Sequence, residues 1–226
     1  LSAMRELIPD ARTFVSSTGR WRYNGYFWKG RYGSYLRKYV SWWATMAYDF
    51  PAKTALVPRE VSTAKKRGKC MLVSRTGNAK ARTGFARFTN GFYAWAMAAD
   101  GVIIDSYAVF RGTPFSNTDG GGWWDTSVVV GGFRGNYVPI PACIGIREGI
   151  DDVRYINTLL KLARDPSLKK KTQKLLEKIR REVVKTCPKI NGLLGSEKIF
   201  EKWTTRKFPE PQKWRSEIIA LIREAK

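Results

Sequence analysis

The 226-residue chain contains no histidine and only three cysteines. Without histidine it has no His-based catalytic triad, lacks the commonest general base and cannot form most zinc sites, so any chemistry must rest on carboxylates, lysine, tyrosine or cysteine. Cys70, Cys143 and Cys187 are widely separated and form no CxxC pair, which favours reduced, mostly buried thiols. We therefore expect no metal ion and no cofactor.

Long apolar runs are also missing. No uninterrupted run approaches the roughly 20 residues that span a bilayer, and "LSAMRELIPD" at the N-terminus lacks the pattern of a signal peptide. We expect no membrane span. The chain begins with Leu1, which suggests a fragment or a processed chain. A hydrophobic fraction of 43% with 13% aromatic residues indicates a folded protein.

Acidic residues are scarce: 41 Lys and Arg stand against 19 Asp and Glu, a formal charge of +22. The basic surplus is more than twice as dense after residue 160 as before it. Within this part, residues 167–188 carry apolar side chains at helical spacing with basic side chains between them. A polyanion would contact Lys169, Lys170, Lys171, Lys174, Lys178 and Arg181. A solvated helix face explains the same pattern, and no known motif accompanies it, so nucleic-acid binding rests on charge alone.

Helices and strands are expected to alternate along the chain. Helices are predicted over 32–50, 59–68 and 144–163, then after 166, with a last one near the C-terminus that begins at Pro209 and Pro211. Strands are predicted over 11–18, 54–58, 69–74, 91–97 and 101–110. The last three strands are continuously apolar, which is typical of a parallel α/β sheet buried on both faces. Residues 111–141 read as a long loop.

The helix predicted over 144–163 carries an acidic cluster. Its apolar positions follow helical spacing: Ile146, Ile150, Val153, Ile156 and Leu160. Glu148, Asp151 and Asp152 would lie in its first turns, where the helix macrodipole favours carboxylates. Arg154 follows Asp151 by three residues and is expected to pair with it. The cluster therefore has a structural explanation.

The stretch "REGIDDVRYINTL" also resembles a family motif. It is similar to the closing helix of carbohydrate-active (β/α)8-barrel proteins with a DUF4091-type C-terminal region, near glycoside hydrolase family 123. The upstream segments "KKRGKCMLVSRTGN" and "ARTGFARFTNGFYAWAMAADGVIIDSYAVFRGTPF" follow the order found there. The resemblance covers about residues 50–165.

This resemblance implies an α/β fold: the C-terminal five βα units of a TIM-type barrel over 1–165, followed by a basic helical extension over 166–226. A second chain or copies of the same chain would complete the barrel or cover its open edge. The implied function is to act on or bind a glycan, with activity dependent on a missing N-terminal part. The alternatives are a non-catalytic structural or assembly subunit, and a protein that binds nucleic acid or another polyanion.

The catalytic residues of this family have no matching motif in this chain. The family's Asp-Glu pair has no counterpart, because the chain contains no Asp-Glu dipeptide. Asp105, near a strand end, and Glu60, which opens a predicted helix, are the remaining candidates, and each has a structural alternative. The substrate-binding candidates are Asp105 and four aromatic residues. Trp95 and Tyr107 would stack on a sugar or belong to the core, and Trp123 and Trp124 would line a cleft or anchor an interface.

Overall fold

In the computed structural model the chain forms two compact units. The structure describes residues 14–17, 42–46, 65–66, 70–76, 83–105, 108–109, 126–127, 129–131, 137–139, 141–186 and 207–225. Unit 1 comprises residues 1–75 and 97–103, and unit 2 comprises 76–96 and 104–226. The expected division at residue 165, between a barrel part and a helical extension, stays a prediction.

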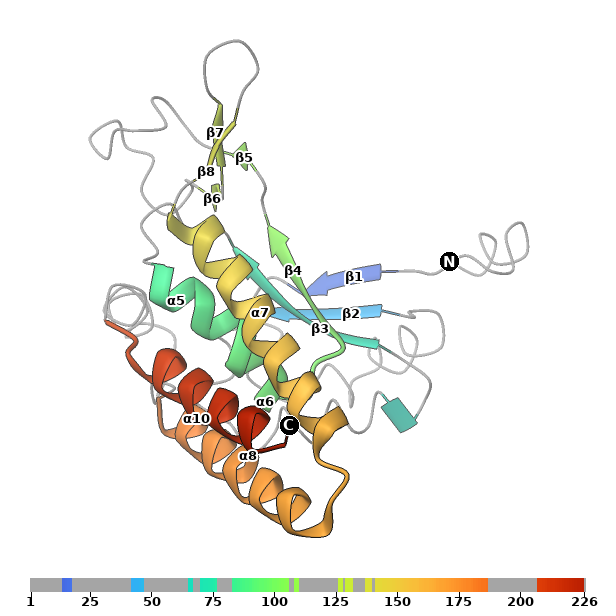
Figure 1. The fold of residues 1–226 in the computed structure, drawn as a ribbon. Helices are drawn as coiled ribbons and strands as arrows, with labels where there is room; N and C mark the ends of the chain where they lie inside the picture. The colour runs from blue at the N-terminus through green and yellow to red at the C-terminus, as the bar shows by residue number, and fades with distance from the viewer. Residues whose placement is uncertain are drawn as a thin grey trace. The chain divides into compact units, whose positions relative to one another are not determined.

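The main sheet has four strands in the order β1-β2-β3-β4 (Figure 1). Their bounds are Phe14–Ser17 for β1, Trp42–Met46 for β2, Cys70–Thr76 for β3 and Gly101–Asp105 for β4. The first three are parallel, with Phe14 aligned to Trp42 and Trp42 aligned to Cys70. Along the chain, β3 is followed by a helical segment and then by β4, as in a βαβ unit.

Two small antiparallel pairs precede the long helices. Strand β5, Ala108–Val109, pairs with β6, Thr126–Ser127. Strand β7, Val129–Gly131, pairs with β8, Tyr137–Pro139. Three of these strands lie inside 111–141, so the prediction of an entirely irregular loop there is wrong.

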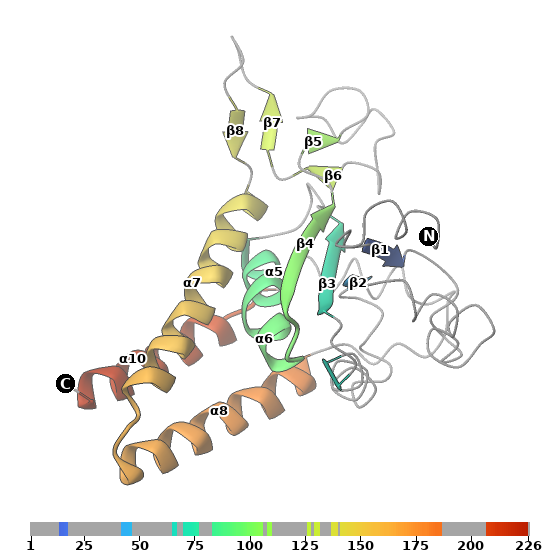
Figure 2. The same ribbon diagram turned by 90° about the vertical axis from the view of Figure 1, so that its right-hand side faces the viewer.

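The other residues of unit 2 that the structure describes are mostly helical (Figure 2). Its helices are α5 (Thr83–Phe88), the π-helix η4 (Thr89–Tyr93), α6 (Ala94–Ala96), α7 (Pro141–Leu162), α8 (Pro166–Thr186) and α10 (Glu210–Glu224). None of the helices among the described residues is long and apolar enough to cross a membrane.

Local sequence signals explain where α8 and α10 begin. The Leu168 N–H donates a 2.9 Å hydrogen bond to Asp165 Oδ2, so Asp165 caps α8 directly before Pro166. This bond and that of Ser167 lower the pKa of Asp165. Helix α10 has Pro211 within its first two positions, as expected from the sequence.

Aromatic side chains form the centre of the helical core. Trp214 of α10 is fully buried and meets the Phe92 ring edge-on, with 4.9 Å between centroids. Phe88 stacks on Phe208 at 5.1 Å. Buried side chains of α8 complete the core: Leu168, Leu176, Ile179 and Val183. Because residues of α10 lie at its centre, the C-terminal helix is part of the core of this unit.

Glycines allow α7 to cross α5 and η4 at short range. A methyl group on Gly149 would lie 2.7 Å from the Arg87 carbonyl oxygen, and one on Gly91 would lie 2.8 Å from the Gly149 Cα. One on Gly145 would lie 2.6 Å from the Ala86 Cβ. Only glycine leaves room for backbone approach at these positions.

Several of the predicted helices and strands are confirmed, and two are wrong. The strands predicted near 11–18, 69–74 and 101–110 correspond to β1, β3 and β4, and the helices predicted at 144–163, after 166 and at the C-terminus correspond to α7, α8 and α10. The segment 91–97, predicted as a strand, is helical, and Trp42–Met46, inside a predicted helix, is a strand. The strand predicted over 54–58 lies outside the described residues.

Candidate functional site

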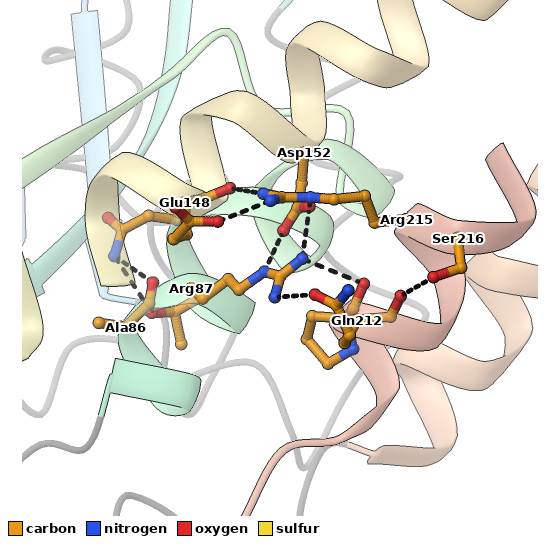
Figure 3. A network of polar contacts seen from close by, with 10 residues as sticks. Ala86, Arg87, Glu148, Asp152, Gln212, Arg215 and Ser216 are labelled. Carbon is orange, nitrogen blue, oxygen red and sulfur yellow. Dashed lines mark hydrogen bonds and ion pairs between the residues drawn. The ribbon is translucent and has the colours of Figure 1, made fainter. Parts of the chain in front are cut away.

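The best-defined polar cluster in the described residues surrounds Asp152 (Figure 3). The Asp152 side chain, on α7, is 0% exposed. Arg87 of α5 donates two hydrogen bonds to this carboxylate. Its Nε donates to Asp152 Oδ2 at 2.7 Å, and its Nη2 donates to Asp152 Oδ1 at 2.9 Å. Two parallel bonds of this kind fix both the distance and the plane of the guanidinium group.

A second cation reaches Asp152 from α10. Arg215 Nε donates to Asp152 Oδ1, and Arg215 Nη1 and Nη2 donate to the side-chain and backbone oxygens of Glu148, both at 2.6 Å. The Arg215 guanidinium also lies 5.5 Å from the centroid of the Tyr155 ring. Burial lowers the pKa of Arg215, but the bonds and charges of Asp152 and Glu148 outweigh it, so the pKa is raised.

Arg87 connects the cluster to the start of α10. Its Nη1 donates to the Gln212 side-chain oxygen at 2.9 Å, and its Nη2 lies 3.4 Å from the Pro211 carbonyl oxygen, which accepts. Three helices distant in sequence are therefore joined by one network. We call Arg87, Glu148, Asp152 and Arg215 the ion-pair cluster.

The sequence places the two acids of the cluster on one side of α7. Glu148 and Asp152 are four residues apart, and such residues share a helix face. Asp151 belongs to a different side, where its Oδ1 accepts a 2.9 Å bond from Arg154, so the predicted Asp151–Arg154 pair is confirmed. The macrodipole explanation is wrong: α7 begins at Pro141, and its first turn contains no acidic residue.

The ion-pair cluster is suited to a structural role. Two guanidinium groups balance two carboxylates, and both oxygens of Asp152 accept bonds from arginine. Because arginine side chains occupy both oxygens of Asp152, the carboxylate holds α5, α7 and α10 together. Among the described residues, no group of His, Cys, Asp and Glu is arranged to hold a metal ion.

The residues proposed for glycan binding are only partly described. Asp105 is the last residue of β4, but its side chain lies outside the described residues. Glu60, Tyr107, Trp123 and Trp124 lie wholly outside them. The structure therefore leaves these five residues as predictions.

Trp95 is the remaining aromatic candidate. It lies in α6, so the expected position near a strand end is wrong. Its side chain is half-buried, and the Arg180 guanidinium of α8 lies 4.7 Å from the ring centroid. A cation already occupies one face of this ring, which leaves less of it for a sugar.

The six basic residues predicted to contact a polyanion lie on α8. Lys169, Lys170, Lys174 and Arg181 are exposed. The other two are used within the protein: Lys171 pairs with Glu224, and Lys178 Nζ lies 2.9 Å from Glu217 Oε2. The bond to Glu217 raises the pKa of Lys178. Both acids belong to α10, so these lysines connect α8 to α10.

Sequence reasoning missed the two arginines of the ion-pair cluster and the glycines of the helix crossing. Asp152 falls among the buried positions of α7, and a buried carboxylate requires a cation. That requirement predicts that an arginine exists but does not identify which one. The pair Gly145 and Gly149, four residues apart, was a direct signal of close helix approach.

Comparison with solved structures finds a similar fold. The chain is similar to a family 123 glycoside hydrolase from Clostridium perfringens, studied for the details of glycolipid glycan hydrolysis, with a TM-score of 0.61 and 15% sequence identity. The match covers 99% of this chain and 39% of that one. No family model and no curated protein matches the chain. The fold is therefore α/β and like that of part of a family 123 glycoside hydrolase.

Proposed function

We propose that this chain forms the C-terminal part of a glycoside hydrolase-like (β/α)8 barrel that acts on a glycan. The observation that carries the proposal is the fold likeness to the Clostridium perfringens enzyme over nearly the whole chain. The parallel arrangement of β1, β2 and β3 supports it, because barrel strands are all parallel. The proposal also agrees with the sequence-based expectation that α7 resembles the closing helix of such a barrel.

The proposed site lies at the carboxyl ends of the strands. TIM-barrel enzymes place their functional groups there, and Asp105 ends β4. Asp105 would serve as one acid or bind a sugar hydroxyl. Most glycosidases need two carboxylates, so a second one would come from the remaining βα units. Tyr107, Trp123 and Trp124 would provide apolar faces for the sugar rings.

The ion-pair cluster has a supporting role in this proposal. It joins α7 to α5 and α10 and so holds the helices that follow the last strands in a fixed arrangement. A cluster saturated by its own ion pairs is not the catalytic centre. Substitutions there should lower stability, whereas substitutions at Asp105 should lower activity or glycan affinity at unchanged stability.

The test is hydrolysis and binding of glycolipid-derived glycans by the assembly that contains this chain. Asp105→Asn is compared with Asp151→Asn, a matched substitution at an acid that pairs with Arg154 on α7. The proposal predicts that only Asp105→Asn reduces hydrolysis. Binding without hydrolysis in the unmodified assembly would identify a non-catalytic derivative of such a barrel. Absence of both would contradict the proposal.

A further inference from the structure

The exposed face of α8 carries a row of basic side chains that no ion pair within the described residues uses. We define the basic row as Lys170, Lys174, Arg181 and Lys185, all exposed. They are separated by four, seven and four residues, so at about 100° per residue they fall within an arc of about 60°. The row is about 22 Å long at 1.5 Å per residue.

The basic row lies opposite the buried side of α8. Leu168, Thr172, Leu176, Ile179 and Val183 form that buried side. Lys171 and Lys178 flank the row and are held by Glu224 and Glu217 of α10. The helix thus has three regions: a core side, a margin paired to α10, and a side whose cations form no ion pair with any other residue that the structure describes. Figure 2 shows α8 as the long orange helix of unit 2.

The composition of this face narrows the class of ligand. None of the exposed residues of α8 is aromatic, so the face offers no ring on which a nucleic-acid base or a sugar could stack. Val184, 38% exposed, is its large hydrophobic residue and is too little to insert into a bilayer. Glu177 is also exposed and borders the row between Lys174 and Arg181, so it lowers the net charge of this face by one. With its remaining basic surplus, the face can recognise negative charge and little else.

The spacing of the cations distinguishes among charged surfaces. The intervals along the row are unequal, about 6 Å, 10 Å and 6 Å. Phosphates of a duplex are fixed in a helical array that one straight row meets over only a few positions. Anionic lipids diffuse in the plane of the membrane and can gather beneath cations at any spacing.

We propose that the basic row of α8 binds the anionic surface of a phospholipid bilayer by charge, without insertion. This goes beyond the proposed glycan function and does not depend on it, because the vesicles of the test contain no glycolipid. Each cation near such a surface contributes about a five-fold factor in partitioning. Loss of all four is expected to weaken binding by about 100-fold or more.

The test measures co-sedimentation of the full chain with vesicles of phosphatidylcholine, with and without phosphatidylserine. The proposal predicts binding only when phosphatidylserine is present, and a steep loss of binding as salt is added. This comparison uses the unaltered chain, so it needs no variant to fold. The row variant is Lys170→Gln, Lys174→Gln, Arg181→Gln and Lys185→Gln. Circular dichroism should show that it remains as helical as the parent chain, since all four side chains are exposed.

The control removes the same net charge from four exposed cations elsewhere in unit 2. It is Arg147→Gln, Lys161→Gln, Lys213→Gln and Arg223→Gln. The row variant should lose binding by about 100-fold or more, and the control by much less. Equal losses would overturn the proposal in favour of net charge. Binding to phosphatidylcholine alone would also overturn it, as would displacement from the vesicles by duplex DNA at matched phosphate concentration.

Discussion

Gly149→Ala should destabilise the protein although it adds a better helix former. The methyl group would lie 2.7 Å from the Arg87 carbonyl oxygen and 2.9 Å from the Gly91 backbone nitrogen. Both obstructing atoms belong to backbone, so no side-chain rotation relieves the contact. α7 would have to move away from α5 and η4.

The size of the effect follows from two opposing contributions. Forcing extra volume into a packed contact typically costs about 1–3 kcal/mol, and the upper value applies here because both obstructing atoms are backbone. Replacing glycine by alanine inside a helix returns about 1 kcal/mol. The expected net loss in the free energy of unfolding is about 2 kcal/mol, which lowers the melting temperature by about 4–8 °C for a chain of this size.

Thermal and urea unfolding of the full chain measure this loss. The matched control is Asn157→Ala, an exposed position on the same helix, which should leave stability unchanged or raise it by about 0.5 kcal/mol. A Gly149→Ala protein as stable as the parent chain would refute the close crossing. So would an equal loss in both variants.

Three further predictions concern single residues. Asp152→Asn removes the charge between two arginines and should lower the free energy of unfolding in urea by about 3–5 kcal/mol. Asp151→Asn, at an exposed ion pair, should lower it by less than about 1 kcal/mol. Equal effects would contradict a structural role for the cluster. Ala98 has a φ of 55°, in the left-handed region, so Ala98→Gly should raise stability by about 0.5–1 kcal/mol, while Ala99→Gly should not. The folded-state pKa of Asp165 is lowered, so its stabilisation is complete above its unfolded pKa of about 4 and is lost as pH falls through the folded value. Asp165→Ala should therefore melt at a lower temperature at neutral pH and lose less on acidification, and an unchanged pH profile would count against the cap.

Helical periodicity predicted the long helices because their burial is one-sided. In α8 the apolar residues Leu168, Leu176, Ile179 and Val183 recur at helical spacing, and the structure buries all four. In α7 Ile146 and Ile156 of the predicted apolar stripe are buried, but Ile150 and Leu160 are exposed. The prediction of a strand over 91–97 failed for the opposite reason. Phe92 and Tyr93 are neighbours and both fully buried, so the apolar run has no period that separates a strand from a buried helix.

Only the two acids of the ion-pair cluster could be predicted from the sequence. The four-residue spacing of Glu148 and Asp152 is local and visible in the sequence. Their partners are not local: Arg87 and Arg215 lie 65 and 63 residues from Asp152. With 41 basic residues in the chain, charge alone could not select these two. Tertiary packing selects them.

The central claim is that this chain supplies one part of a glycoside hydrolase-like barrel. The most direct test is the native mass of the particle that contains it, measured by light scattering, with every polypeptide identified by mass spectrometry. The account predicts a particle that also contains the remaining βα units, in a longer polypeptide or a second chain, and a carboxylate that can pair with Asp105. A particle made only of these 226 residues, in any number of copies, would contradict it.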